Sequence, residues 1–450
     1  MSLRVIILAA GLGTRMKSAQ PKMLHTICGK PMILWTIEIA KSVSPEKPVL
    51  VVGHGAEAVR TLVGGQAEFV EQPDLLGTAD AVRRAEGLLR GKAERILIFY
   101  GDMPLWNPDT FRALVEAEER NRGPLAFLTG VARDARNFGR VIRDGTGQVE
   151  KIVEEAHATV EQKEVREINL GAYCFRADWL WSALPKVKAS PKGEYYLTDL
   201  VAMAASEGGV TAIPVEDEEE WIGVNTRAHL AEAEAAMRRR VNRRWMDAGV
   251  GMQDPATVYI SFEAIIGEGT LLLPNTHLEG KAVVGRDCVI GPNTIVRGSA
   301  VGDRCQVECS VVEDAVLEED VSVGPFAHLR AGAYLARGAH MGNFGEVKNS
   351  RLGAGAKMGH FSYLGDATVG AGANIGAGTV TCNFDGKQKN RTEIGEGAFI
   401  GSDTMLVAPV KIGKGARTGA GSVVTHDVPD GATVIGVPAK KLHKDDAKKT

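Results

Sequence analysis

The chain has 450 residues, 44% of them hydrophobic and 24% charged, so its length suggests about three globular folding units of ~150 residues each. The formal net charge of −3 gives no electrostatic case for binding nucleic acid or an anionic membrane surface. The six cysteines are scattered without a Cys-x-x-Cys pair, which argues against a disulfide framework and a cysteine zinc site.

The N-terminal half alternates between short apolar strands and helices. Its clearest predicted elements are strands over 4–10, 48–52 and 95–100, and helices over 31–42, 56–63 and 78–89. This alternation predicts a parallel sheet with helices on both faces, whose ligands bind at the carboxyl ends of the strands. A glycine-rich turn follows the first strand and Asp102 follows the third, so both are expected at such an end.

Residues 226–247 contain neither glycine nor proline and are rich in helix-forming residues. They predict one helix of roughly 20 residues, about 30 Å long. The character of the sequence changes completely after this helix. We therefore expect an N-terminal domain over 1–226, a linker helix over 227–249 and a C-terminal domain over 250–450.

Beyond residue 250, aliphatic residues recur every six positions. The first series contains Ile266, Leu272, Leu278, Val284, Ile290 and Val296, and later series fall within 317–347, 352–364 and 394–424. Neither an α-helix nor an amphipathic strand has this period, whereas a triangular solenoid with three hexapeptides per coil does. The repeat therefore predicts an all-β hexapeptide solenoid whose interior is filled by the aliphatic side chains.

The polar segment 382–393 interrupts the six-residue period and is expected to loop out of the solenoid. Loops on rigid scaffolds often carry function, and this one holds three positive charges within 387–391. A tolerated surface insertion is the alternative interpretation of the segment taken alone.

The main N-terminal motif is the glycine-rich turn. It reads Leu8-Ala9-Ala10-Gly11-Leu12-Gly13-Thr14-Arg15 and is followed by Pro21-Lys22. Gly11 and Gly13 are expected to let backbone N–H groups approach phosphate oxygens, with the N-terminus of a following helix adding positive potential. Arg15 and Lys22 supply cations for a polyanionic ligand.

This motif resembles the signature of sugar-phosphate nucleotidyltransferases. The likeness continues, in order, through Gln72, Gly77-Thr78, Tyr100-Gly101-Asp102, 138–140, 153–154, 167–171, 194–199 and 223–225. With the hexapeptide repeat, nearly all of the chain resembles the bifunctional N-acetylglucosamine-1-phosphate uridyltransferases and glucosamine-1-phosphate N-acetyltransferases. The resemblance implies a Rossmann-like α/β nucleotidyltransferase domain, joined by a long helix to a left-handed parallel β-helix.

For the N-terminal domain, the resemblance implies uridylyl transfer from UTP to N-acetylglucosamine 1-phosphate, with release of pyrophosphate. It makes Arg15 and Lys22 catalytic cations and assigns Mg²⁺ to Asp102 and Asn225, whose hard oxygens suit that ion. Gln72, with the backbone at Gly77, would read the uracil edge. The residues expected at UTP or the UDP-sugar are Leu8, Ala9, Ala10, Gly11, Gly13, Lys22, Gln72, Gly77, Thr78, Tyr100, Gly101, Asp102, Gly139, Glu154, Asn169 and Asn225.

Within that set, Gly139, Glu154 and Asn169 are expected to bind the sugar and its N-acetyl group. The sugar phosphate is already an anionic nucleophile, so alignment and charge neutralisation would carry the reaction. One departure from the family pattern is Leu12, where lysine is common, and it predicts a changed affinity for the triphosphate. Asp102, taken alone, is also compatible with an ordinary helix cap.

His360 is the candidate base of the C-terminal domain. Transfer of an acetyl group from a thioester to an amine needs a base for the amine proton, and imidazole suits this at neutral pH. A lone histidine on a solenoid is also compatible with an ordinary surface group. The catalytic role is favoured by surrounding residues that match the family's pattern: Arg330, Lys348, Tyr363, Asn374, Asn383 and Lys389.

The resemblance implies acetyl transfer from acetyl-CoA to glucosamine 1-phosphate at this site. It assigns glucosamine 1-phosphate to Arg330, Lys348, Tyr363 and Asn374, and acetyl-CoA to Asn383, Phe384, Lys389, Ser402 and Ala420. Asn383 is also expected near the sugar, and Lys389 near its phosphate. Phe384 stands where the family commonly has tyrosine. The end of the chain lacks an arginine that the family often uses near CoA, for which Lys440 or Lys441 would substitute.

Two other functions remain open from the sequence. The solenoid of a nucleotidyltransferase can serve only oligomerisation or regulation, and the scaffold can also form a non-catalytic assembly subunit. The resemblance further implies a homotrimer with sites at the edges between solenoids. The apolar run 5–10 is shorter than a signal-peptide core, and no stretch approaches a membrane span of about 20 residues, so we expect a cytoplasmic protein.

Overall fold

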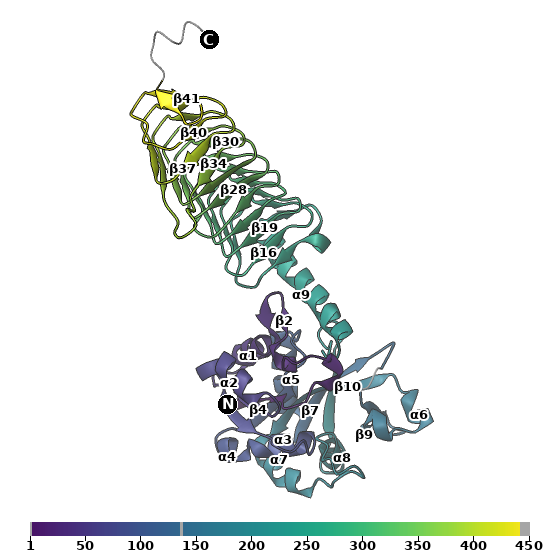
Figure 1. The fold of residues 1–450 in the computed structure, drawn as a ribbon. Helices are drawn as coiled ribbons and strands as arrows, with labels where there is room; N and C mark the ends of the chain where they lie inside the picture. Colours follow the sequence, from purple (N-terminus) through teal and green to yellow (C-terminus); the bar gives the residue numbers. More distant parts are fainter. Residues whose placement is uncertain (1, 136–137, 442–450) are drawn as a thin grey trace. The chain divides into compact units, whose positions relative to one another are not determined.

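The computed structural model describes residues 2–135 and 138–441 of the chain. It contains two compact units, Met1–Met237 and Arg238–Thr450, each with its own core (Figure 1). The finer boundaries at residues 226 and 249 stay a prediction. Within the described ranges, every helix is too short or too polar to span a bilayer.

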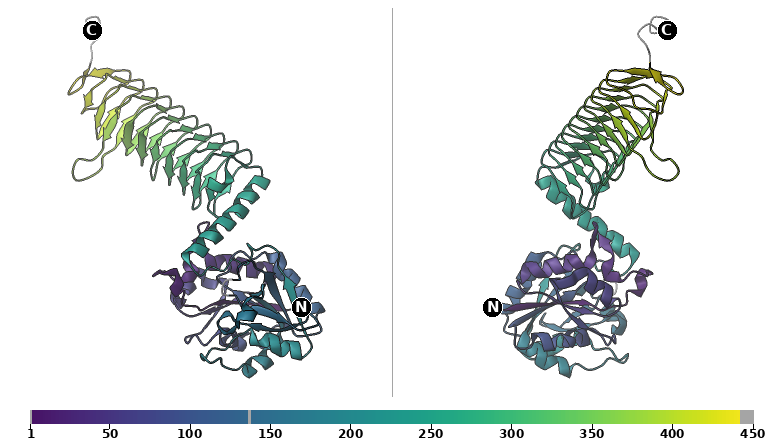
Figure 2. Two further views of the ribbon diagram at one scale, coloured as in Figure 1. Left: turned by 90° about the vertical axis from the view of Figure 1, so that its right-hand side faces the viewer. Right: turned by 60° about the vertical axis from the view of Figure 1, so that its left-hand side comes forward.

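The first unit is built around a nine-stranded sheet that is twisted in Figure 2. Its seven-strand path runs in the order β11-β7-β10-β6-β1-β4-β5. The bounds along this path are β11 (Val210–Pro214), β7 (Leu125–Val131), β10 (Glu167–Arg176), β6 (Arg95–Tyr100), β1 (Leu3–Ala9), β4 (Val49–Val52) and β5 (Glu68–Glu71). The hairpin of β8 (Arg140–Arg143) and β9 (Val149–Val153) pairs with β10 through β8.

The predicted α/β sheet with helices on both faces is confirmed, with one strand that departs from the parallel arrangement: β10 runs antiparallel to both β6 and β7. The predicted strands β1, β4 and β6 are parallel, and β5, which was not predicted, pairs parallel with β4. Between β7 and β10 the chain forms a β-hairpin and two short helical turns instead of a long crossover helix, and an antiparallel return needs no such crossover.

Helices cover both faces of the sheet and bury two apolar clusters. One cluster includes residues of α3 (Thr78–Arg84), α7 (Ala177–Ala183) and α8 (Asp199–Ser206), and the other includes residues of α1 (Met32–Val43) and α5 (Pro108–Arg120). Because successive side chains of a strand point to opposite faces of the sheet, Leu8 of β1 packs in the first cluster and Ala9 in the second.

Two local predictions differ from the structure. The helix predicted over 78–89 is divided into α3 and α4 (Glu86–Leu89), and the N–H of Ala85 between them bonds three residues back, to the carbonyl of Val82. The expectation of a helix after the glycine-rich turn is wrong. Only the 3-10 turn η1 (Thr14–Met16) follows it, because the chain turns left-handed at Lys17 and the first α-helix begins at Met32.

The second unit is a β-solenoid with three parallel sheets, and Figure 1 shows its coils stacked. The twelve-stranded sheet runs from β12 (Gly251–Met252) to β42 (Lys440–Lys441), which alone is antiparallel. The ten-stranded sheet runs from β13 (Tyr259–Ile260) to β40 (Val423–Val424) and the nine-stranded sheet from β14 (Ile265–Ile266) to β38 (Val410–Ile412). The predicted hexapeptide solenoid is confirmed.

The six-residue series form the interior of this solenoid. Leu272, Leu278, Ile290 and Val296 are at most 1% exposed. The offset in the sequence period has a structural cause: Leu278 pairs with Val296, eighteen residues on, but Val296 pairs with Val312, sixteen residues on. Some coils are therefore shorter than three full hexapeptides.

The predicted long helix is α9 (Arg227–Asp247). In the first unit it buries Ala233 and Ala236, and its Glu234 accepts a hydrogen bond from the backbone N–H of Cys28 at 2.7 Å. In the second unit the Asn242 side chain donates to the carbonyls of Pro255 and Val258 at 2.8 and 3.0 Å. These bonds fix the Asn242 amide beside the first coil of the solenoid.

Candidate active sites

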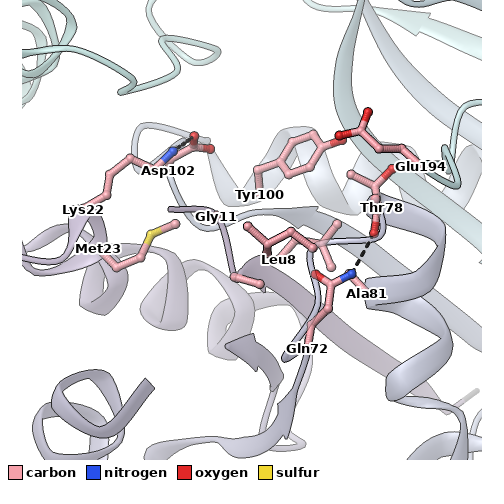
Figure 3. Close-up of a pocket in the computed structure, with 13 residues that line it drawn as sticks. Leu8, Gly11, Lys22, Met23, Gln72, Thr78, Ala81, Tyr100, Asp102 and Glu194 are labelled. Atoms are coloured by element: carbon pink, nitrogen blue, oxygen red, sulfur yellow. Dashed lines mark hydrogen bonds and ion pairs between the residues drawn. The ribbon is translucent and has the colours of Figure 1, made fainter. Parts of the chain in front are cut away.

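The first unit has a cavity of about 240 Å³ at the carboxyl end of β1 and β6 (Figure 3). It is lined by Leu8, Ala10, Gly11, Lys22, Met23, Gln72, Leu75, Gly77, Thr78, Ala81, Tyr100, Asp102 and Glu194. Nine of these residues are among those expected at the nucleotide. The side chain of Ala9 instead packs in the core on the other face of the sheet, so only its backbone would serve a ligand.

Four polar side chains meet at one end of this cavity. The Lys22 Nζ lies 2.6 Å from Asp102 Oδ2 and 3.2 Å from Asn225 Oδ1 (Figure 3 draws the first contact). Arg15 Nη2 donates to the same Asn225 oxygen at 3.0 Å. Two hard oxygens therefore face one cationic nitrogen, which is the environment that a divalent cation also requires.

The two glycines of the turn have different surroundings. A methyl group on Gly11 would meet no atom within 4 Å, and Gly11 lines the cavity. Gly13 has φ 65°, and a methyl group there would approach Lys22 Cβ to 2.8 Å. Gly11 therefore leaves space for a ligand, whereas Gly13 allows the close approach of the Lys22 side chain.

These surroundings predict opposite effects of adding one methyl group. We expect Gly11→Ala to raise the KM for UTP about 10-fold, because the methyl enters the ligand space, with an unchanged melting temperature. Gly13→Ala is expected to destabilise the first unit by about 1–2 kcal/mol, because alanine is strained at positive φ. Steady-state kinetics and thermal unfolding of both variants check this, and a stability loss in Gly11→Ala would contradict it.

At the other end of the cavity, Gln72 is buried and its amide is fixed. Its Nε2 donates to the carbonyl of Gly77 at 2.9 Å and to Asp80 Oδ2 at 3.0 Å. Both amide hydrogens are used in these bonds, so the side chain is left to act toward a base as an acceptor through Oε1.

Tyr100 lines the same cavity and is close to the carboxylate of Glu154, one of the residues expected at the sugar. Burial raises its pKa, and the nearby carboxylates of Glu154 and Asp102 raise it further, so the phenol stays protonated at neutral pH. Burial also raises the pKa of Glu154, which accepts a hydrogen bond from Thr198 Oγ1 at 2.7 Å.

Asn169 and Gly139 adjoin this region through the backbone. The N–H of Asn169 donates to the carbonyl of Gly139 at 2.9 Å, and its Nδ2 donates to Tyr173 Oη at 2.6 Å. A methyl group on Gly139 would lie 2.9 Å from Ile152 Cγ2 and 3.7 Å from Glu154 Oε2. Both residues are therefore held in place, although neither lines the cavity described above.

In the second unit, a groove runs along the twelve-stranded sheet. It crosses β27 (His340–Met341), β30 (Lys357–Met358), β33 (Asn374–Ile375), β36 (Phe399–Ile400) and β39 (Arg417–Thr418). Among the predicted residues, it is lined by His360, Asn374, Ser402 and Ala420. His360 is exposed, and no hydrogen-bond partner of its ring lies within the described ranges. Lys440 and Lys441 form the last strand of the same sheet.

Three other residues expected at the acetyl-transfer site lie outside this groove, on or directly after strands of the ten-stranded sheet. Lys348 ends β28 (Gly345–Lys348) and Tyr363 lies in β31 (Ser362–Gly365). Arg330 directly follows a strand of this sheet and pairs with Glu346 at 2.8 Å. Apart from those in the segment that interrupts the repeat, the predicted site residues of one chain therefore form two groups, one on each sheet.

The segment that interrupts the repeat projects from the solenoid, in yellow-green in Figure 2. Its ends are joined by the bond from the N–H of Asn390 to the carbonyl of Asn383 at 2.7 Å, and Phe384 and Lys389 form a β-bridge. The Asn383 side chain donates to Asp366 Oδ2 at 2.6 Å. Asn383 is thereby fixed, while Phe384 and Lys389 remain exposed.

Several residues at these sites were not predicted from the sequence. Asp80, Glu346 and Asp366 each fix a predicted side chain, and His340 and Phe399 line the groove. Asp80 is two residues beyond the Gly77-Thr78 motif, which is the only local signal for it. The other contacts join neighbouring coils and follow from the register of the solenoid.

Comparisons with known proteins agree with the division into two sites. Residues 5–162 match the MobA-like NTP transferase domain, and 263–298 and 391–426 match the bacterial transferase hexapeptide repeats. Both matches fit the sheet unit and the solenoid described above.

Similarity to curated proteins extends over nearly the full chain. The bifunctional protein GlmU of Heliobacterium modesticaldum is 46% identical, over 96% of this chain and 94% of its own length. Proteins with the same name from Shouchella clausii and Carboxydothermus hydrogenoformans are 43% and 44% identical, each over 98% of this chain and 97% and 99% of their own lengths. The resemblance inferred from the motifs is therefore confirmed, and the chain belongs to the GlmU family of bifunctional proteins.

Proposed function

We propose that the protein makes UDP-N-acetylglucosamine by two reactions at two sites. The second unit transfers acetyl from acetyl-CoA to glucosamine 1-phosphate, and the first unit transfers uridylyl from UTP to the N-acetylated product. The observation that carries the proposal is the cavity with Lys22 between two oxygens at one end and the fixed Gln72 amide at the other. This arrangement suits a nucleoside triphosphate with its phosphates at the first end and its base at the second.

In the uridylyl transfer, a phosphate oxygen of the sugar bonds to the α-phosphorus of UTP, and the bond from that phosphorus to the pyrophosphate breaks. Arg15 and Lys22 neutralise the negative charge that grows on the leaving pyrophosphate. Gln72 holds the base and Tyr100 separates the nucleotide from the sugar. The side chains of Glu154 and Asn169 orient the sugar and its N-acetyl group.

The residues present fit Mg²⁺, because Asp102 Oδ2 and Asn225 Oδ1 already share one cationic partner. These two side chains would hold the ion. When bound, it would supply positive charge beside the substrate phosphates.

In the acetyl transfer, the sugar amine attacks the thioester carbonyl, a C–N bond forms and the C–S bond breaks. His360 takes the amine proton, and the CoA thiol leaves. Arg330, Lys348 and Lys389 bind the sugar phosphate, while Tyr363, Asn374 and Asn383 orient the sugar. Ser402 and Ala420 face CoA in the groove, with Phe384 nearby and Lys440 or Lys441 in place of the missing arginine.

We further infer a homotrimer in the cytoplasm. The division of the acetyl-site residues between two sheets supports a site completed by a neighbouring copy, which the exposed segment with Phe384 and Lys389 would reach. The six free cysteines suit a reducing compartment. Light scattering of the purified protein measures the oligomeric state, and a monomer would contradict the trimer.

The deciding assay follows free thiol and pyrophosphate separately in one mixture of glucosamine 1-phosphate, acetyl-CoA, UTP and Mg²⁺. We expect both products, with pyrophosphate depending on prior acetylation. Normal pyrophosphate release from N-acetylglucosamine 1-phosphate without any thiol release would instead support the alternative, in which the solenoid only oligomerises or regulates. Release of neither product would leave only a non-catalytic role.

A further inference from the structure

Asp80 is a buried carboxylate that the reaction itself does not use. It lies in α3 with 1% of its surface exposed, next to Gln72, which is 3% exposed. Its Oδ2 accepts from Gln72 Nε2 at 3.0 Å, and its Oδ1 accepts from Arg83 Nη2 at 2.7 Å. Arg84 Nε lies 3.3 Å from Oδ2. The carboxylate thus joins the base-reading amide to two arginines.

These arginines keep Asp80 in the form that can only accept hydrogen bonds. Burial alone would raise its pKa, but the hydrogen bonds from Gln72 and Arg83 and the charge of Arg84 hold the pKa below its usual range. The ionised carboxylate has no proton to donate. It therefore requires the NH₂ side of the Gln72 amide, as does the Gly77 carbonyl at 2.9 Å.

A reversed Gln72 amide would place Oε1 against two acceptors, the Asp80 carboxylate and the Gly77 carbonyl. Both contacts would be repulsive, and a buried polar group without a partner is costly. The amide is consequently locked with Oε1 as its only remaining hydrogen-bonding group. Oε1 accepts from a donor and is repelled by a lone pair.

We propose that Asp80 is the specificity-determining residue that selects uracil over cytosine, by locking Gln72 as a hydrogen-bond acceptor toward N3 of the base. Uracil carries a hydrogen on N3, which Oε1 accepts. Cytosine carries a lone pair on N3, which faces Oε1 without a hydrogen between them. This inference rests on the proposed use of UTP and adds the residue that sets the choice of base.

The test is the ratio of kcat/KM for UTP to kcat/KM for CTP, measured by pyrophosphate release from N-acetylglucosamine 1-phosphate. In Asp80→Asn the neighbour can donate as well as accept, so a Gln72 amide with its NH₂ turned toward N3 is opposed by the Gly77 carbonyl alone. We expect the ratio to fall about 10- to 100-fold, through a higher KM for UTP and a lower KM for CTP. Asp80→Ala, which removes the acceptor without adding a donor, should shift the ratio in the same direction.

The matched control is Glu86→Gln, the same carboxylate-to-amide change in α4, where Glu86 pairs with Arg90 at the surface. Its ratio should equal that of the unmodified protein. Equal losses for UTP and CTP in both Asp80 variants would indicate a purely structural role and overturn the inference. Absence of pyrophosphate from UTP in the unmodified protein would instead overturn the proposed function.

Discussion

Replacing His360 with alanine is expected to lower thiol release from acetyl-CoA by about 10²–10⁴-fold, the usual contribution of a positioned general base. His360 lines the groove on the twelve-stranded sheet together with Asn374, Ser402 and Ala420. The amine must lose a proton as it attacks the thioester, and no other predicted residue of this groove can take that proton near neutral pH.

The same variant should leave pyrophosphate release from N-acetylglucosamine 1-phosphate unchanged, because that reaction uses residues of the first unit alone. Both products are measured separately with purified His360→Ala. His426→Ala is the matched control, since His426 is an exposed histidine of the solenoid whose ring bonds Thr425 Oγ1 at 3.0 Å. Normal thiol release by His360→Ala, or an equal loss in His426→Ala, would contradict the assignment.

Much of the fold follows from two periodicities in the sequence. The six-residue period has one simple structural solution, and its aliphatic residues lie buried in the interior of the solenoid. Strand–helix alternation likewise predicts the parallel strands β1, β4 and β6, whereas β5 was not predicted. The direction of β10 was not predictable in this way, because its pairing with β6 joins Cys174 to Leu97, far apart in the sequence.

The candidate sites were likewise predictable only in part. Glycine-rich and lysine motifs are local patterns, so Gly11 and Asp102 were predictable at the carboxyl ends of two strands and Lys22 as a cation for the ligand. The contacts that give them a geometry were not, because Lys22 meets Asn225 across 203 residues of sequence. The same limit applies to the solenoid, where a surface residue such as Tyr363 belongs to a sheet only once the coil register is known.

The orientation of the Gln72 amide is fixed by its neighbours and does not follow from the residue type alone. A carboxamide offers both hydrogen-bonding functions, and the sequence alone leaves its orientation open. Asp80 and the Gly77 carbonyl remove one of the two functions. Base selection is thus a property of the buried neighbours as much as of the side chain that touches the base.

Replacing Asp102 with asparagine is expected to lower pyrophosphate release by about 10³-fold while thiol release stays normal. Asp102 has the only carboxylate that contacts Lys22 within the described part of the chain, at 2.6 Å. The asparagine keeps the shape of the side chain but removes its negative charge. The phosphate end of the cavity would then lose its anionic partner for Lys22 and for Mg²⁺.

The expected defect therefore has a signature that simple misfolding lacks: the Mg²⁺ concentration for half-maximal rate should rise in Asp102→Asn, and excess Mg²⁺ should restore part of the activity. Asp109→Asn is the control, because Asp109 is an exposed carboxylate near the start of α5, where it pairs with Arg112. Its Mg²⁺ dependence should match that of the unmodified protein. An unchanged Mg²⁺ dependence in Asp102→Asn would mean that Asp102 acts only through Lys22, and the ion would then need other ligands.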